Sequence, residues 1–378
     1  MHRPIVSSPL PSLPPLPLRS LLPWPLLLVS GLLYTGCGSA RSSLDGGAGH
    51  MGPVAGTGGA AGAGGGVIND ASGLPPVPGA GGVPKPDGAP GELTVLSWAG
   101  FKGAVSYTFD DANSSQIQHY GDLNGTGVPL TFFLITGKPE ASDPVWKQAI
   151  KDGHEISNHS MSHAQVGTGA DVDAATAFLL QTLGVTAYDM AAPYGDASYQ
   201  PLAATRFLLN RGVSDCLIGA GVGDATDPYN LCCYIAPTGA LAGAYNNEID
   251  AAQTAGRWRI VLVHGFTGGT DSAYQAVSID EFTASVRHAR SLGNLWIDTM
   301  INIGAYWRAQ KVIAAVTPSA AGATRTWTWT LPAHFPPGKY LRVSVAGGTV
   351  RQGGQTLAWN DQGFYQIALD AGSVTATP

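Results

Sequence analysis

The sequence predicts an α/β fold with a parallel sheet, open or closed as a barrel, followed by a small all-β module. Between residues 92 and 313, short apolar runs rich in β-branched residues alternate with segments of helical periodicity, as in β–α–β units. Beyond residue 318 the pattern changes to period-two alternation broken by Gly, Asp and Asn turns, which is typical of antiparallel strands. The 378-residue length accommodates both parts and a shorter N-terminal region.

Residues 1–37 have the features of a secretory signal peptide. Residues 21–33 form an apolar run that is too short for a stable membrane anchor and contains Pro23 and Pro25. Small residues before Cys37 are similar to a bacterial lipoprotein cleavage box, so we expect Cys37 to become a lipidated N-terminus; ordinary secretion is the alternative. Either route predicts an exported protein, as a cell-envelope lipoprotein or in secreted form.

Residues 38–91 consist mainly of Gly, Ala, Pro, Ser and Val, and this composition predicts a flexible linker. The net charge is −6 and only 12% of residues are charged, so the chain has no basic field to attract nucleic acid, and that class of partner is excluded. We expect membrane contact only through a lipid on Cys37.

The domain expected at 92–313 contains strands and helices in alternation. The expected strands are 103–109, 129–135, 153–157, 186–191, 213–218, 258–263 and 295–297. The expected helices are 144–151, 171–183, 200–210, 278–292 and 302–312. Asp171 or Asp173 is expected to cap the second helix, and Ser278 with Glu281 forms a capping box at the fourth.

The module expected at 318–378 is a small β-sandwich. Its expected strands are 326–330, 340–345, 355–359 and 364–369. Three tryptophans in these strands favour core or domain packing, with stacking on glycans as the alternative: Trp327, Trp329 and Trp359.

Polar residues follow the strand-like runs. Asp110 and Asp111 end the first run, and His159 and His163 lie four residues apart after a later one. Imidazoles at positions i and i+4 point the same way on a helical turn, which suits one metal ion. We expect one aspartate and both histidines to bind zinc, leaving a position for water, while the other aspartate takes that water's proton. His264 ends another apolar strand, where it could donate a proton to a leaving group or serve only as a polar residue at the rim.

These motifs, in this order, resemble the polysaccharide deacetylases, the family 4 carbohydrate esterases built on the NodB-homology domain. The motifs are Tyr-Thr-Phe-Asp-Asp at 107–111, Gly-His-Glu-Ile-Ser-Asn-His-Ser-Met-Ser-His at 153–163, Ala-Pro-Tyr-Gly at 192–195 and Leu-Val-His at 262–264. The resemblance covers about residues 100–313. It implies a distorted (β/α) barrel and the removal of acetyl groups from N- or O-acetylated polysaccharide, with Zn²⁺ or another divalent metal such as Co²⁺ and metal-bound water as nucleophile.

The resemblance also implies a role for each matching residue. Asp110 corresponds to the general base and His264 to the general acid. The metal ligands correspond to Asp111, His159 and His163. Tyr194 corresponds to the residue whose backbone N–H stabilises the oxyanion, and Leu262 would line the pocket for the acetyl methyl group.

Two features depart from the family pattern. Ala191 stands where the family has an arginine that orients the base, and Arg206 or Arg211 is expected to substitute for it. No Asp-Trp pair matches the motif that supports the general acid; Asp215 and Asp224 lack a suitable Trp. These departures favour an alternative, a non-catalytic glycan-binding surface lipoprotein. A further alternative is a hydrolase of amide bonds in non-sugar substrates.

The remaining cysteines predict one disulfide. Cys216 can pair with Cys232 or with Cys233, leaving the other thiol free, since an exported protein can keep a disulfide. We expect substrate choice to depend on loops such as 219–250, in which no pattern identifies the sugar.

Overall fold

The computed structural model describes residues 72–378. The expected signal peptide, the lipidation site Cys37 and residues 38–71 of the expected linker lie outside this range, so they stay predictions. Among residues 72–378, each helix is too short or too polar to span a membrane.

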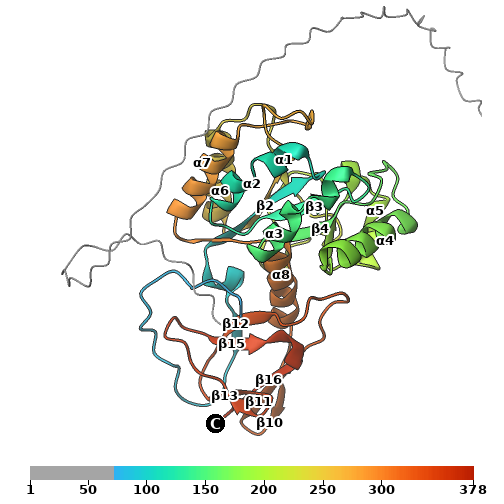
Figure 1. Cartoon of the computed structure of the whole chain (residues 1–378). Coiled ribbons are helices and arrows are strands. Elements are labelled where there is room, and N and C mark those ends of the chain that lie inside the picture. Colours follow the sequence, from blue (N-terminus) through green and yellow to red (C-terminus); the bar gives the residue numbers. More distant parts are fainter. Residues whose placement is uncertain (1–71) are drawn as a thin grey trace, which may run out of the picture. The chain divides into compact units, whose positions relative to one another are not determined.

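An eight-stranded parallel sheet forms the centre of the larger domain (Figure 1). Its strand order is β6-β5-β4-β3-β2-β8-β7, and β9 pairs with β2. The strands are β2 (Gly103–Asp110), β3 (Thr131–Leu134), β4 (Glu155–Asn158), β5 (Asp189–Ala191), β6 (Leu209–Arg211), β7 (Tyr234–Ile235), β8 (Trp258–Val263) and β9 (Leu295–Ile297). Strand β2 is buried along its whole length, as its apolar run predicts for a parallel strand covered on both faces.

The two edges of this sheet meet. Arg211 at the end of β6 forms a parallel bridge with Leu231, which precedes β7. The Gly212 N–H donates to the Leu231 carbonyl at 2.9 Å, and the Leu231 N–H donates to the Asn210 carbonyl at 2.9 Å. These bonds close the sheet into a distorted (β/α) barrel, and the predicted fold class is confirmed.

Helices connect successive strands outside the barrel. They are α1 (Ser114–Gln118), α2 (Tyr120–Asn124), α3 (Val145–Lys151), α4 (Gly169–Phe178), α5 (Tyr199–Ala204), α6 (Ala242–Ala255), α7 (Ile279–Ser291) and α8 (Met300–Ala314). Helix α4 begins two residues earlier than expected, because the Thr168 hydroxyl accepts from the Asp171 N–H and is the cap. The expected caps Asp171 and Asp173 lie inside the helix. At α7 the Ser278 hydroxyl accepts from the Glu281 N–H as predicted.

Two of the elements expected from the sequence differ from those in the structure. The expected helix 200–210 ends at Ala204, because residues 207–210 are buried and the Leu208 N–H bonds to the Tyr188 carbonyl on the way into β6. The expected strand 213–218 is a loop whose bridge to the sheet is formed by Ile218, which pairs antiparallel with Trp258.

Successive side chains of β2 point alternately to the hydrophobic core outside the barrel and to the site inside it. The rings of Tyr107 and Phe109 pack edge-on against Phe282 of α7, outside the barrel. Side chains alternate across a strand, so Ser106 and Asp110 point to the other face. There the Ser106 hydroxyl accepts from the indole of Trp258, and Asp110 pairs with Arg211.

The C-terminal module contains two antiparallel sheets, ordered β1-β12-β15 and β10-β11-β16-β13-β14. The strands are β1 (Leu93–Val95), β10 (Ser319–Ala321), β11 (Thr324–Thr328), β12 (Tyr340–Val345), β13 (Thr349–Gln352), β14 (Gln355–Thr356), β15 (Tyr365–Ala368) and β16 (Ser373–Thr377). Trp327 and Trp329 are buried in its core, which favours the packing interpretation over glycan stacking. Strand β1 comes before the barrel in sequence, so the module is built from both ends of the described chain.

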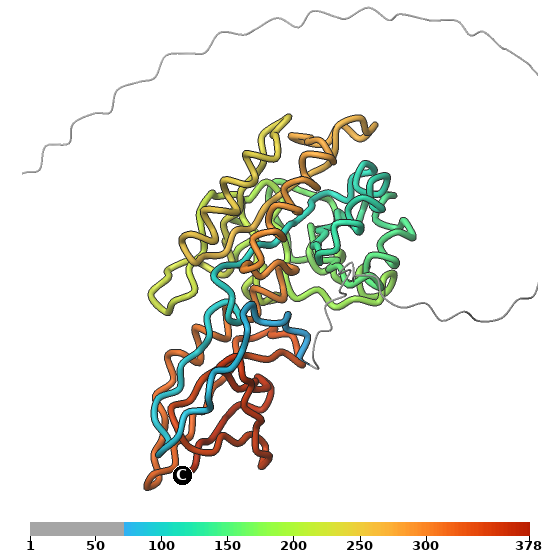
Figure 2. Tube along the Cα trace, turned by 90° about the vertical axis from the view of Figure 1, so that its left-hand side faces the viewer, coloured from blue at the N-terminus to red at the C-terminus, as the bar shows by residue number. Residues whose placement is uncertain are grey.

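Residues 72–91 also pack on this module, although the sequence predicts a flexible linker there. The Val83 N–H donates to the Asp361 carbonyl at 2.7 Å, and the indole of Trp359 donates to the Val83 carbonyl at 2.9 Å. Figure 2 shows this segment, in blue, beside the strands of the module, in red. A Gly/Pro-rich composition therefore does not prevent packing where a neighbouring loop supplies donors and acceptors.

Helix α8 joins the barrel to the module (Figure 1). The Trp307 indole donates to the Gly219 carbonyl at 2.9 Å, while the Tyr306 hydroxyl donates to the Leu96 carbonyl at 2.6 Å. Gly304 faces the barrel, where an added Cβ would lie 2.1 Å from the side chain of Leu209. Only glycine lets this helix approach the barrel so closely.

Arg342 of β12 is a buried cation that fixes residues 72–100 to the module, and we expect Arg342→Ala to lower the free energy of unfolding by about 2–4 kcal/mol. Its guanidinium donates to the carbonyls of Ala99 and Pro75, both at 2.7 Å, and lies over the Phe364 ring. The measurement is urea unfolding of the full chain. Arg351→Ala, at an exposed arginine of β13, is the control and should change stability by less than about 0.5 kcal/mol. Equal losses from the two variants would refute the anchoring role.

Candidate metal centre and active site

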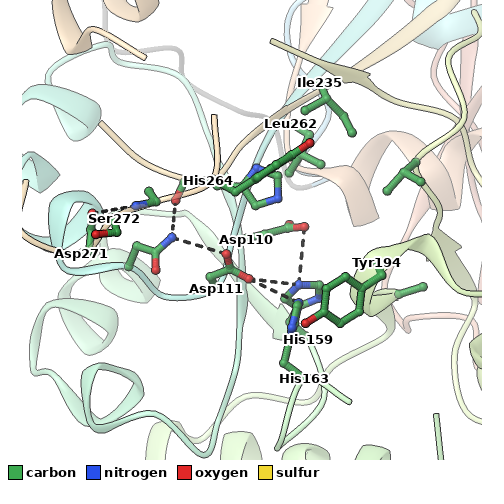
Figure 3. A pocket seen from close by; sticks show the side chains of 15 residues that line it. Asp110, Asp111, His159, His163, Tyr194, Ile235, Leu262, His264, Asp271 and Ser272 are labelled. Carbon is green, nitrogen blue, oxygen red and sulfur yellow. Dashed lines mark hydrogen bonds and ion pairs between the residues drawn. The ribbon is translucent and has the colours of Figure 1, made fainter. Parts of the chain in front are cut away.

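A cavity of about 620 Å³ lies at the carboxyl ends of the barrel strands. Its lining contains the residues singled out from the sequence, which come from four different strand ends: Asp110, Asp111, His159, His163, Tyr194, Leu262 and His264 (Figure 3). Because parallel strands share one carboxyl end, motifs far apart in the sequence converge at one place.

The chain turns sharply where β2 ends. Asp111 and Ala112 have φ values of 79° and 54°, in the left-handed region that non-glycine residues rarely adopt. This turn breaks the alternation of a strand, so the adjacent carboxylates of Asp110 and Asp111 both reach the cavity. Strained backbone of this kind is often found at functional sites.

Asp111, His159 and His163 form a candidate metal site. One ligand atom from each lies within 4.8 Å of the others, and Asp111 Oδ1 is 3.4 Å from His159 Nε2 and 3.6 Å from His163 Nε2. Asp111 Oδ1 is buried and has no hydrogen-bond partner among residues 72–378, as expected for an atom that a cation would satisfy. Two imidazoles and one carboxylate suit Zn²⁺ or a similar divalent ion.

The backbone carbonyl of Ala191 orients His159. Its Nδ1 lies 2.9 Å from the Ala191 carbonyl, so Nδ1 carries the proton and the Nε2 lone pair faces Asp111. Residues 159–163 form a tight turn instead of the expected helical turn, because Ser160 and His163 have φ values of 60° and 54°. The Ser160 hydroxyl accepts from the His163 N–H at 2.9 Å, and this bond brings the two imidazoles together.

Electrostatics favour a cation at this site. Burial raises the pKa of Asp111, but the adjacent imidazole of His159, with those of His264 and His163, holds that pKa below its ordinary value. Burial lowers the pKa of His163. Burial also lowers the pKa of His159, yet the carboxylates of Asp110 and Asp111 outweigh it and raise that pKa. A metal ion and a proton would therefore compete for Nε2 of His159.

Arg211 supplies the cation for Asp110. Its Nη2 donates to both carboxylate oxygens, with 2.6 Å to Oδ1, and the two side chains are 0% and 4% exposed. Arg211 stands directly opposite Ala191 in the β5–β6 register, so the guanidinium comes from the neighbouring strand at the same level. Arg206, the other candidate, forms an ion pair with Asp173 on α4. Burial lowers the pKa of Arg211, but the charge of Asp110 outweighs it and raises that pKa.

His264 follows β8 and faces the same cavity. Its backbone carbonyl accepts from Asn113 Nδ2 at 2.8 Å and from Gln116 Nε2 at 2.7 Å, and its ring packs edge-on with Tyr274 at 5.2 Å between centroids. The carboxylates that the sequence offered as supports are engaged elsewhere: Asp215 pairs with Arg259 and Asp224 with Lys311.

Tyr194 lies in a turn beside the metal site. Its φ is 57°, and its ring contacts His163 at 4.5 Å between centroids. The ring is 62% exposed at the rim of the cavity, as is that of Tyr274. The apolar part of the wall includes Leu262 and Ile235 (Figure 3).

Several lining residues were not predicted. Asn113 donates to the His264 carbonyl and, at 3.5 Å, to Asp111 Oδ2, while its own carbonyl oxygen accepts from Lys138. Its position directly after the Asp-Asp-Ala segment is a signal that could have identified it. The cavity is also lined by residues 271–274, which have no recognisable motif, whereas Ile235 represents the loop 219–250 that was expected to set substrate choice.

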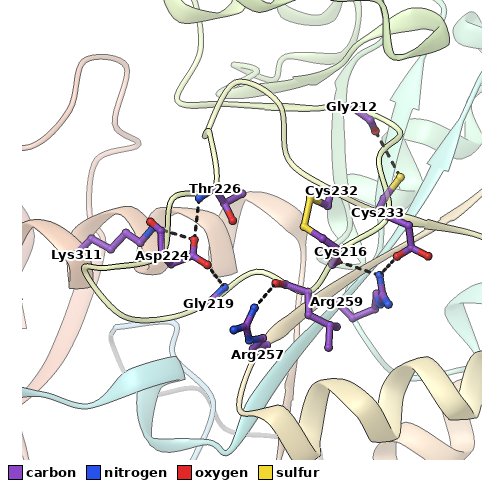
Figure 4. Close-up of a disulfide and its surroundings, with 12 residues drawn as sticks. Gly212, Cys216, Gly219, Asp224, Thr226, Cys232, Cys233, Arg257, Arg259 and Lys311 are labelled. Atoms are coloured by element: carbon purple, nitrogen blue, oxygen red, sulfur yellow. Dashed lines mark hydrogen bonds and ion pairs between the residues drawn. A yellow bond between two sulfur atoms is a disulfide. The ribbon is translucent and has the colours of Figure 1, made fainter.

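Cys216 pairs with Cys232, and Cys233 is a buried free thiol (Figure 4). The Cys233 thiol donates to the Gly212 carbonyl at 3.4 Å and lies 3.7 Å from Arg211 Nη1. The disulfide thus ties the 212–219 loop to the segment that carries Ile235, and both line or support the cavity.

The chain thus combines a distorted (β/α) barrel with a candidate metal site of two histidines and one aspartate, and a buried carboxylate lies beside that site. Residues 100–209 match the family model described as polysaccharide deacetylase. The match includes Asp110, Asp111, His159, His163 and Tyr194, and it ends just before Arg211. The sequence of this part of the chain is therefore similar to that of polysaccharide deacetylases.

Known proteins are similar over parts of their length. A gellan lyase from a Bacillus species is 31% identical over 132 residues, which is 32% of this chain but only 5% of that protein. Among solved structures, a Mycobacterium smegmatis protein described as a polysaccharide deacetylase is 18% identical, with a TM-score of 0.45 over 58% of this chain and 94% of its own. A cobalt-bound acetyl xylan esterase from Clostridium thermocellum is 16% identical, with a TM-score of 0.36 over 53% and 89%. A peptidoglycan deacetylase from Bacillus subtilis is 16% identical, with a TM-score of 0.37 over the same shares.

Removing one metal ligand should abolish tight metal binding. We expect Asp111→Asn, His159→Ala and His163→Ala each to weaken Zn²⁺ affinity by more than about 100-fold, since even the indirect partners of ligands change affinity about 10- to 100-fold. Isothermal titration of the metal-free full chain with Zn²⁺ measures this. His288→Ala, at a histidine paired with Asp250 outside the cavity, should bind like the wild type. Unchanged affinity in the three ligand variants would rule out this metal site.

Removing Arg211 should leave a buried carboxylate without its partner. We expect Arg211→Met to lower the free energy of unfolding by about 3–5 kcal/mol. The control is Arg206→Met, which breaks the exposed pair with Asp173 and should cost about 0–1 kcal/mol. Urea unfolding of the full chain compares them, and a similar small loss for both would contradict the role assigned to the Arg211–Asp110 pair.

Proposed function

We propose that this protein is a metal-dependent hydrolase that removes acetyl groups from an acetylated polysaccharide. The observation that carries the proposal is the placement of Asp110, held by Arg211, next to the Asp111–His159–His163 triad in one cavity. A base beside a metal site is the arrangement that metal-assisted hydrolysis requires. The family of residues 100–209 supports a polysaccharide as substrate.

Each residue at the metal side of the cavity has its own role in the proposed reaction. Asp111, His159 and His163 hold Zn²⁺ or another divalent ion such as Co²⁺, which when bound lowers the pKa of water and polarises an acetyl carbonyl. Asp110 accepts a proton from the attacking water, and its Oδ2 is 3.6 Å from His159 Nε2, beside the triad. Arg211 fixes the orientation of that carboxylate.

The other side of the cavity serves the acetyl group and the leaving group. His264 donates a hydrogen bond or proton to the leaving atom. The backbone N–H of Tyr194 stabilises the oxyanion, in the turn that packs against His163. The apolar wall that includes Leu262 and Ile235 accommodates the methyl group.

Export of the protein and a lipid anchor on Cys37 belong to the same proposal. The Cys216–Cys232 disulfide supports export, because such bonds persist in oxidising compartments. An exported hydrolase would meet its polysaccharide outside the cytoplasm.

Acetate release tests the function. The Zn²⁺-loaded full chain should release acetate from chitin-like, peptidoglycan-like or xylan-like substrates, or from a generic acetyl ester. Asp110→Asn should retain Zn²⁺ and lose activity by about 10²–10⁴-fold, because it removes the proton acceptor without removing a ligand. Enzymatic determination of acetate gives the rates.

Asp173→Asn, at the surface carboxylate that pairs with Arg206, is the matched control and should have wild-type activity. If the wild type binds Zn²⁺ and binds glycans but releases no acetate from any of these substrates, the chain is the glycan-binding relative instead. Full activity in Asp110→Asn would show that another group is the base.

A further inference from the structure

Gln116 of α1 is a buried amide that has no part in the proposed reaction as described so far. It is 1% exposed, and its side chain lies outside the lining of the cavity. Its Nε2 donates to the Asp110 carbonyl at 2.5 Å and to the His264 carbonyl at 2.7 Å. One side-chain amide therefore joins the backbone of the proposed base to the backbone of the proposed acid.

The orientation of this amide follows from its two partners. The nitrogen carries two hydrogens, and each is used in one of the two bonds. The reverse orientation would put Oε1 against two carbonyl oxygens, and three acceptors in contact repel one another. Oε1 of Gln116 is itself buried and has no hydrogen-bond partner among residues 72–378. The side chain therefore contributes through its two donors, and the fold tolerates an unsatisfied oxygen to keep them.

The two carbonyls belong to the residues that come directly after a strand pairing. Strands β2 and β8 pair in parallel up to Phe109 and Val263, and Asp110 and His264 are the next residues on the two chains. Beyond the last pair, ladder bonds no longer fix the distance between the chains. The Gln116 bridge extends the connection to the level at which the side chains of the proposed base and acid face the cavity.

Two neighbours of this glutamine strengthen the connection. Asn113 Nδ2 donates to the same His264 carbonyl at 2.8 Å. The hydroxyl of the buried Ser115 accepts from the Phe266 N–H at 3.0 Å, and the Ser115 N–H donates to Asp271 Oδ2 at 2.6 Å. The beginning of α1 is thus docked on the segment that follows β8, and the His264 carbonyl receives two of the bonds.

We infer that Gln116 is a positioning residue that holds the proposed acid His264 at a fixed distance from the proposed base Asp110, an inference that rests on the proposed function. An acid acts on a leaving atom only within hydrogen-bond reach, and a displacement of about 1 Å can lower a rate about 10²-fold. The edge-on contact with Tyr274 limits the movement of the His264 ring, while the amide bridge fixes its backbone. Support through the backbone thus stands in place of the Asp-Trp motif that the sequence lacks.

The test compares two leaving groups with the Zn²⁺-loaded full chain. Gln116→Met removes both donors and should lower kcat on an acetylated xylan or chitin oligosaccharide, whichever the wild type hydrolyses faster. This loss should be at least about 10-fold larger than on 4-nitrophenyl acetate, whose phenolate leaves without an acid. KM should change less than about 3-fold, because the residue lies outside the cavity lining, and Zn²⁺ affinity by isothermal titration should not change. Gln118→Met, at an exposed residue of the same helix, is the control and should match the wild type on both substrates.

A double variant shows whether Gln116 acts through His264. In a His264→Ala background, Gln116→Met should leave the ratio of the two rates unaltered, because the group that it positions is gone. A further fall in that ratio would overturn the inference, as would equal losses on both substrates from Gln116→Met alone, which a purely structural residue would give. If Gln116→Met does not fold, Gln116→Asn, whose shorter side chain cannot reach both carbonyls, provides the same comparison. A wild type that releases acetate from no substrate would instead refute the proposed function itself.

Discussion

The buried ion pair between Arg211 and Asp110 is the constraint on which the site depends. A carboxylate this deeply buried is tolerated only with a partner. Arg211 reaches Asp110 of β2 because the end of β6 closes the barrel against Leu231, before β7. The same closure brings the Cys233 thiol next to the arginine, and the residue before it, Cys232, is bonded to Cys216. The barrel seam, the disulfide and the proposed base therefore form one structural unit.

Backbone strain concentrates around the same site. Asp111, Ser160, His163 and Tyr194 all have positive φ values, and each lies directly beyond a strand end or in the turn that follows it. Such conformations persist only where surrounding bonds fix them, here the Ser160–His163 bond and the His159–Ala191 bond. As a consequence, the ligand atoms are pre-organised before a cation binds.

The motifs found in the sequence account for much of the site because each is local. Asp110 and Asp111 end an apolar strand, and His159 and His163 follow another, so one rule about parallel strands places all four at one edge. Arg211 could be named only as one of two candidates, because the β5–β6 register that places it joins segments far apart in the sequence. Asn113 was not predicted, because its side-chain bond to His264 is also non-local. The packing of residues 72–91 on the module also depends on non-local contacts, so their composition did not predict it.

The class of fold, the order of most strands and helices, and the residues that could bind a metal or move a proton follow from the sequence alone. Periodicity and the chemistry of side chains are properties of the chain, independent of how it packs. The tertiary structure was needed to show that Arg211 supplies the cation absent at Ala191 and that Cys216 pairs with Cys232. It also shows that His264 Nδ1 has no acceptor among residues 72–378. These outcomes depend on distances between segments far apart in sequence, which only barrel closure fixes.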